Sequence, residues 1–200
     1  AMDELLRAPG YWRGLMRAYL EAAYRHPAVQ PGLGGAVGYC LGGQCVLEQV
    51  RAGHPIQAVV SFHGVYHSRP RHPSVDRRLT KEEFASEVEA APNSYSKACR
   101  VLIEHGDHDT RPGRDSLSIA EWRAEMDAEG IDWQFTTHAR TPHGFALAPG
   151  VWGSAYTEAA DRRSTRDMLA LFAEAWPEYP QLRVEANACG TLLWGRSSRL

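Results

Sequence analysis

Cysteine is scarce in this 200-residue sequence, and long apolar runs are missing. The four cysteines form no C-x-x-C pair, which excludes the spacing of zinc ribbons and thioredoxin-like motifs. Sparse cysteine is typical of a reducing compartment. No apolar run is long enough to span a bilayer, and the acidic start does not resemble a secretory signal. These absences predict a cytoplasmic protein with no membrane contact.

The sequence also lacks an excess of positive or negative charge, because its net charge is only -2 at pH 7. This balance argues against nucleic acid or an anionic membrane as a partner. What the chain does have is 44% hydrophobic residues, which is enough for one domain with its own core. We expect that domain over residues 1–180, followed by an irregular tail at 181–200.

Short apolar runs alternate with segments of helical period, which predicts an α/β fold with a parallel sheet. An apolar and aromatic stripe on the first helix, which includes Tyr11 and Tyr19, is expected to face the core. Residues 64–97 are irregular and predict a lid or binding loop. The expected strands are 35–39, 58–62, 101–103 and 133–137, and the expected helices are about 11–26, 42–52, 116–129 and 155–176.

The most informative stretch is Gly38-Tyr39-Cys40-Leu41-Gly42-Gly43, which joins the first strand to a helix. A G-x-(Ser or Cys)-x-G sequence in this context is typical of a nucleophile elbow. We expect Gly38 and Gly42 to remove Cβ atoms that would crowd the turn. The helix N-terminus favours the thiolate of Cys40, and the N–H of Leu41 can receive an oxyanion. The alternative is a buried structural cysteine.

Polar clusters follow two later strands, at Asp107 and Asp109 and at His143. The carboxyl ends of parallel strands lie at one edge of a sheet, so these side chains are expected to meet Cys40 there. The order nucleophile, acid, histidine is that of α/β-hydrolases. In such a trio the imidazole takes or holds the thiol proton, and the carboxylate orients the imidazole.

Two other interpretations of these residues are weaker. The run His105-Gly106-Asp107-His108-Asp109 contains metal-ligand types, but one turn cannot easily aim all four side chains inward, so no metal is expected. A redox-sensing thiol would need a resolving partner, and Cys45 lies on a different face of its helix. The remaining histidines that we considered, His63, His67, His72 and His138, are expected on the surface or at strand ends.

The motifs together resemble the dienelactone hydrolase family of α/β-hydrolases over about residues 10–178. They are the Gly38–Gly43 block, Ser61-Phe62-His63-Gly64, the His105–Asp109 run and Pro142-His143-Gly144-Phe145. The resemblance implies a three-layer α/β-hydrolase sheet of which about the four C-terminal strands are present. It also implies Cys40 as nucleophile, Asp109 as acid and His143 as base. Asp109 is preferred to Asp107 because the acid of the family stands three residues after the glycine.

Two departures from the family pattern stand out. Only about 39 residues precede Cys40, and they are helical in pattern, so the N-terminal strands and second oxyanion donor of the family are expected to be missing. The elbow strand would then be an exposed edge, which predicts a fragment, a half of a split protein or a homo-oligomer. Leu147 stands where the resemblance implies an arginine that binds the substrate carboxylate, although Arg111 or the 64–97 arginines could replace it.

The resemblance implies a hydrolase of small-molecule esters or lactones, of the carboxymethylenebutenolidase type, that works through a thioester and needs no cofactor. The alternative is a non-catalytic or partner-dependent module that retains the fold for binding or dimerisation. A fast reaction of Cys40 with iodoacetamide would distinguish the two.

Overall fold

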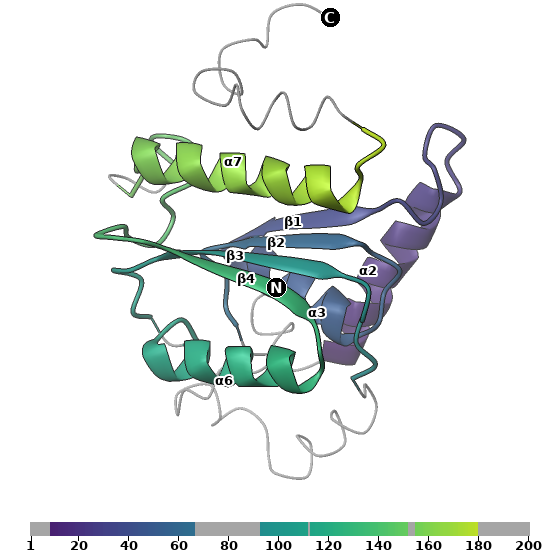
Figure 1. The fold of residues 1–200 in the computed structure, drawn as a ribbon, viewed down its shortest axis with the longest axis horizontal. Helices are drawn as coiled ribbons and strands as arrows, with labels where there is room; N and C mark the ends of the chain where they lie inside the picture. The colour runs from purple at the N-terminus through teal and green to yellow at the C-terminus, as the bar shows by residue number, and fades with distance from the viewer. Residues whose placement is uncertain (1–8, 67–92, 112, 152–154, 180–200) are drawn as a thin grey trace, which may run out of the picture.

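Four parallel strands form one sheet with helices on both faces in the computed structural model (Figure 1). The structure describes residues 9–66, 93–111, 113–151 and 155–179, so the predicted tail and most of the predicted 64–97 loop lie outside the described residues. The predicted α/β fold with about four strands is confirmed. The strands, in their order across the sheet, are β1 (Gly35–Tyr39), β2 (Ala58–Phe62), β3 (Arg100–Gly106) and β4 (Asp132–His138).

Helix α7 covers one face of the sheet, and α3 and α6 cover the other (Figure 1). The predicted helices are present within one or two residues at most ends. Strands β3 and β4 are longer than predicted because the ladder includes polar residues at their ends, from Glu104 to Gly106 and at His138, which hydropathy alone leaves out. The helices are α2 (Pro9–Tyr24), α3 (Leu41–Arg51), α6 (Ser116–Ala128) and α7 (Glu158–Ala175).

The core has two parts, one on each face of the sheet. Side chains alternate along a strand, so Val59 packs toward α3 and α6 while Val60 and Phe62 pack toward α7. Every residue of β2 is buried, as expected for a strand covered on both faces. Asp115 caps α6 by accepting the backbone N–H of Ser118 at 3.0 Å.

Helix α2 corrects one prediction, because part of its apolar stripe does not face the core. Tyr11 is 66% exposed and Tyr19 is 70% exposed. The helix packs on α3 rather than on the sheet, so only a narrow side of it is covered. The side chain of Arg13 makes part of that contact by pairing with Glu48 of α3 at 2.7 Å.

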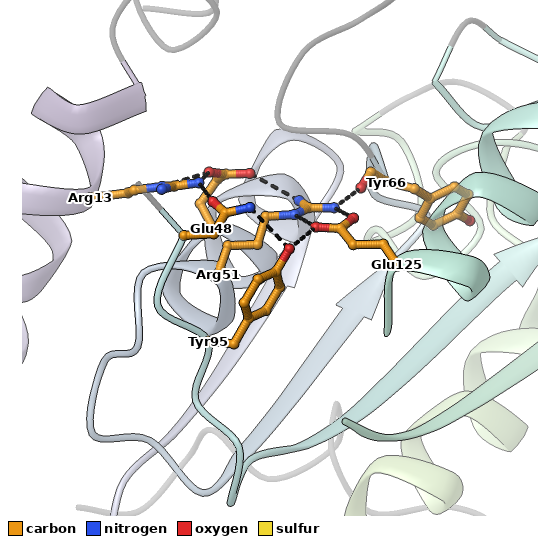
Figure 2. A network of polar contacts seen from close by, with 7 residues as sticks. Arg13, Glu48, Arg51, Tyr66, Tyr95 and Glu125 are labelled. Atoms are coloured by element: carbon orange, nitrogen blue, oxygen red, sulfur yellow. Dashed lines mark hydrogen bonds and ion pairs between the residues drawn. The ribbon is translucent and has the colours of Figure 1, made fainter. Parts of the chain in front are cut away.

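A buried network of charged and polar side chains ties α2, α3 and α6 together (Figure 2). Glu48 accepts from Arg13 through Oε2 at 2.8 Å and from Arg51 through Oε1 at 2.9 Å. Arg51 also donates twice to Glu125 of α6, at 2.7 Å each, and to the carbonyl of Tyr66 at 2.6 Å. The network therefore reaches the segment that directly follows β2.

Strand β1 lies at the edge of the described sheet, beside β2 only. This confirms, for the residues that the structure describes, that the strand carrying the predicted elbow is an edge strand. Val37 and Tyr39 are each 39% exposed on it. None of the described helices combines the length and the hydropathy that crossing a bilayer would need.

Candidate active site

Cys40 sits in a sharp turn between β1 and α3. Its backbone has φ 54° and ψ -115°, a conformation that few residues other than glycine adopt. The turn is fixed on one side by the Cys40 N–H, which donates to the carbonyl of Phe62 at 3.0 Å. A Cβ on Gly38 would overlap the carbonyl group of Gly42, so the predicted need for glycine at position 38 is confirmed.

The same prediction is wrong for Gly42. Nothing lies within 4 Å of a Cβ placed there, because this position is already in the first turn of α3 and faces open space. The turn brings the carbonyl of Gly42 close to the Cα of Gly38, so it is position 38 that must lack a side chain. Gly43 is the other glycine of this motif that has no room for a Cβ, since a Cβ there would overlap the Ser61 hydroxyl.

The structure brings the three predicted side chains together at the carboxyl edge of the sheet. The Sγ of Cys40 lies 3.2 Å from Nε2 of His143, and Nδ1 of His143 lies 2.6 Å from Oδ2 of Asp109. Asp109 follows β3, and His143 follows β4. The loops that carry them are held to each other, because His108 N–H donates to the carbonyl of Thr141 at 3.0 Å.

The charges of this trio favour a thiolate beside an imidazolium. The hydrogen bond with His143 lowers the pKa of Cys40 despite partial burial, and the guanidinium of Arg114 and the backbone N–H of Leu41 lower it further. Burial disfavours the charged form of His143, but its hydrogen bonds with Asp109 and Cys40 outweigh burial and raise its pKa. Opposite shifts of a thiol and its base are the pattern of an activated nucleophile.

Asp109 is buried yet stays ionised. Burial alone would raise the pKa of its carboxyl, but the hydrogen bond with His143 and the charges of His143 and Arg114 lower it. The Nε of Arg114 lies 3.4 Å from Oδ2 of Asp109. Sequence reasoning missed Arg114, because no motif marks an arginine five residues after the acid.

The other members of the His105–Asp109 run point in different directions. His105 is buried, and its Nδ1 pairs with the hydroxyl of Tyr66 at 2.7 Å. Asp107 and His108 are exposed, while Asp109 faces His143. In the described part of the chain, no three His, Cys, Asp or Glu side chains gather closely enough to hold a metal ion.

His63 and His138 lie at strand ends as predicted, but neither is on the surface. His138 is buried and pairs with Glu104 at 2.6 Å. The ring of His63 is fully buried beside His143, with 4.7 Å between centroids, and both of its nitrogens lack a hydrogen-bond partner. Burial and the charge of His143 lower the pKa of His63 to about 3, so the ring is neutral.

Leu147, at the position where the family pattern has the carboxylate-binding arginine, is half-buried. Of the arginines that could replace it, Arg111 is exposed, and those of the 64–97 loop lie outside the described residues. The arginine that reaches Cys40 is Arg114, whose Nη2 lies 4.0 Å from the sulfur.

A doubly covered parallel sheet with a strained turn after one strand, an acid after another and a histidine after the next is the plan of an α/β-hydrolase. Solved structures agree. A Bacillus cereus carboxylesterase superposes with a TM-score of 0.51 at 14% identity, covering 82% of this chain and 59% of its own, which supports the fold alone.

The sequence profile of the dienelactone hydrolase family matches residues 4–176, so the chain belongs to that family. It is 28% identical over 168 residues to the uncharacterized protein K02A2.1 of Caenorhabditis elegans, covering 80% of this chain and 92% of that one. Two solved structures are similar at 27% and 26% identity, with TM-scores of 0.63 and 0.59. They are m3DLH and a dienelactone hydrolase-like promiscuous phosphotriesterase from metagenomic libraries. This chain, at 84% coverage, spans 62% of the length of each.

Proposed function

We propose that the protein hydrolyses ester or lactone bonds of small molecules through a Cys40–His143–Asp109 triad. The observation that carries the proposal is the unbroken contact chain from sulfur to imidazole to carboxylate, at 3.2 and 2.6 Å. Membership of the dienelactone hydrolase family supports the same class of reaction. A reducing compartment such as the cytoplasm would keep Cys40 as the free thiol that this chemistry needs.

In the first half of the reaction the thiolate of Cys40 attacks the carbonyl carbon and forms a tetrahedral intermediate. The N–H of Leu41, at the N-terminus of α3, stabilises the oxyanion. As the intermediate collapses, the bond to the leaving oxygen breaks, and His143 gives that oxygen its Nε2 proton. The product of this half is a thioester on Cys40 and a new hydroxyl group, which departs as an alcohol, phenol or enol when the substrate is an ester and stays on the acyl group when it is a lactone.

In the second half His143 takes a proton from water, and the hydroxide attacks the thioester carbonyl. The C–S bond breaks, the thiolate returns, and the carboxylic acid leaves. Asp109 keeps Nδ1 of His143 protonated and oriented in both halves, since its carboxylate accepts that N–H at 2.6 Å. No metal or organic cofactor takes part in these steps.

Activated esters suit this site best. A thiolate is itself a good leaving group, so a poor alkoxide would leave the intermediate more slowly than sulfur does. Aryl esters and enol lactones release a phenolate or an enolate and avoid that reversal. Similarity at 26% identity to a promiscuous phosphotriesterase adds aryl phosphotriesters to the panel worth testing.

The test is hydrolysis of an aryl ester by the purified chain and by single variants. Cys40→Ala and His143→Ala are each expected to lower kcat on the order of 10⁴-fold or more, because triad members act as a unit. Cys45→Ala is the matched control, since that thiol lies on the adjacent helix outside the contact chain. Equal turnover by Cys40→Ala and the wild type would remove the proposal.

A second candidate function is a partner-dependent module that pairs through the β1 edge with a second copy. Its support is the edge position of β1 and the exposure of Val37 and Tyr39. Size-exclusion chromatography with light scattering tests it. A stable monomer that hydrolyses esters would contradict it, whereas a dimer disrupted by Val37→Lys would support it.

A further inference from the structure

Arg114 is a buried arginine that reaches both ends of the triad. Its side chain is only 9% exposed. The Nη2 group points at the sulfur of Cys40 at an N···S distance of 4.0 Å, and Nε lies 3.4 Å from Oδ2 of Asp109. The same Nε donates to the backbone carbonyl of His63 at 3.1 Å. The guanidinium is therefore close to both the thiol of Cys40 and the carboxylate of Asp109, and neither contact involves His143.

The backbone around Arg114 is held in place from two sides. Its own N–H donates to the carbonyl of Arg111 at 2.9 Å, and the preceding Gly113, at φ +81°, receives the N–H of Tyr66 at 3.0 Å. A Cβ on Gly113 would crowd the side chain of Val65, so the loop that carries Arg114 is in close contact with the segment that follows β2. A charge held this way needs little reorganisation when the charge on sulfur changes.

The backbone directly after β2 provides the acceptor for this arginine. His63 has a positive φ of 41°, and its N–H donates to the carbonyl of Glu104 at 2.8 Å while its own carbonyl accepts from Arg114. Tyr66 is anchored in turn by Arg51, which donates to its carbonyl at 2.6 Å (Figure 2). The buried ion network of α3 and α6 thus ends next to the loop that presents Arg114.

We propose that Arg114 is a positioning residue that holds the Cys40 sulfur as a thiolate and draws anionic groups to it. The inference rests on Cys40 being the nucleophile of the proposed function. The Arg114 guanidinium places a fixed positive charge beside the sulfur, whereas the charge of His143 is lost when that ring gives up its proton. The site then keeps a positive charge beside the sulfur during the steps in which His143 is neutral.

The other charged and polar groups that face Cys40 do not replace this role. His143 carries the mobile proton, and Asp109 is negative. The neighbouring ring of His63 is neutral, because burial and the charge of His143 lower its pKa to about 3. The N–H of Leu41 contributes a partial charge only. Among the residues that the structure describes, Arg114 is therefore the side chain beside the sulfur whose positive charge takes no part in the proton transfers of the proposed reaction.

The experiment measures the rate of Cys40 alkylation by iodoacetamide against pH, following the Cys40 peptide by mass spectrometry. An opposite charge at this distance typically moves a pKa by one unit or more, so Arg114→Gln should raise the midpoint by about one pH unit. Arg114→Lys, which keeps the charge but not the fork, should lie between Arg114→Gln and the wild type. Arg111→Gln, which removes an exposed charge from the same loop, should leave the midpoint unchanged.

Two results would overturn the inference. One is an unchanged midpoint in folded Arg114→Gln, and the other is an equal shift in the Gln and Lys variants, which would show that Arg114 acts on loop structure and not through charge. If Arg114→Gln does not fold, the His143→Ala variant provides the test, because Arg114 is then the full positive charge that remains beside the sulfur. In this variant, the ratio of the Cys40 alkylation rate with iodoacetate to that with iodoacetamide should exceed the same ratio for N-acetylcysteine amide. Added salt should lower that ratio. Equal preference would overturn the inference.

Alkylation needs no turnover, so the two proposals fail separately. A midpoint that depends on Arg114 in a chain that hydrolyses no ester would keep this inference and remove the proposed function. Ester hydrolysis with a midpoint indifferent to Arg114 would do the reverse.

Discussion

Cys40 is a residue in a costly backbone conformation, and its neighbours are what make that conformation possible. A non-glycine residue at φ 54° and ψ -115° costs on the order of 1–3 kcal/mol. The hydrogen bond to the carbonyl of Phe62 offsets part of the cost, and the absence of a Cβ on Gly38 leaves room for the carbonyl of Gly42. The turn lifts the thiol off the sheet edge, where His143 can reach it.

Two glycines of the motif should therefore behave differently when each is replaced by alanine. Gly38→Ala would force a methyl group into the Gly42 carbonyl and is expected to lower the free energy of unfolding by about 3 kcal/mol, with loss of rapid Cys40 alkylation. Gly42→Ala meets open space in the first turn of α3 and is expected to be neutral or stabilising by up to about 1 kcal/mol.

Urea unfolding of both variants makes the comparison. If the two variants lost similar amounts of stability, the turn would not depend on the absence of a side chain at position 38.

Helix α3 is the element on which the site and the scaffold both depend. Its N-terminus follows Cys40 directly, and its body carries Glu48 and Arg51, which link it to α2 and α6 (Figure 2). Both side chains are almost fully buried. A buried charge is tolerated because it is paired on several sides, and removal of one partner leaves the others exposed to an apolar interior.

Glu48→Ala should for that reason cost about 3–5 kcal/mol of unfolding free energy, because it leaves Arg13 and Arg51 without their shared carboxylate. The control is Glu21→Ala on α2, which breaks an exposed pair with Arg17 and should change stability little. Denaturant titration of both variants measures the difference. If the two losses were alike, the buried network would not be what joins these helices.

At the scale of the whole molecule, the sheet gathers buried ionisable groups whose opposing pKa shifts shape stability against pH. Glu104, from β3, is fully buried and pairs with His138 of β4. Burial raises the pKa of Glu104 from 4.5 to about 7, although the hydrogen bond with His138 works against that rise. Asp109, a few residues on, is shifted in the opposite direction.

A raised carboxyl pKa means that the folded state binds the proton more tightly than the unfolded state does. The contribution of Glu104 to stability is then full below pH 4.5 and is lost as pH rises toward about 7. Glu104→Gln removes this titration and keeps a polar side chain against His138. Its free energy of unfolding, relative to wild type, should therefore increase between about pH 5 and about pH 8.

Glu174→Gln, at an exposed position of α7, is the control and should track the wild type at both pH values. A constant difference between Glu104→Gln and wild type across this range would contradict the raised pKa.

Short-range patterns in the sequence were enough to predict much of this protein. Apolar runs and turn residues gave the strands, the glycine spacing marked the turn at Cys40, and the parallel order of strands predicted that Cys40, the pair Asp107 and Asp109, and His143 would meet. The family resemblance then selected Asp109 from that pair. These inferences succeed because each depends on local sterics or on a topological rule that the residue types already express.

Other features came from the tertiary structure alone. The exposure of Tyr11 and Tyr19, the open space at Gly42, the burial of His63 and His138 and the approach of Arg114 to Cys40 all depend on which surfaces cover one another. An arginine in a loop has the same local pattern whether it faces water or a sulfur, and only long-range packing distinguishes the two. The sequence by itself determined which residues could react, and the packing of distant segments decided which charges surround them.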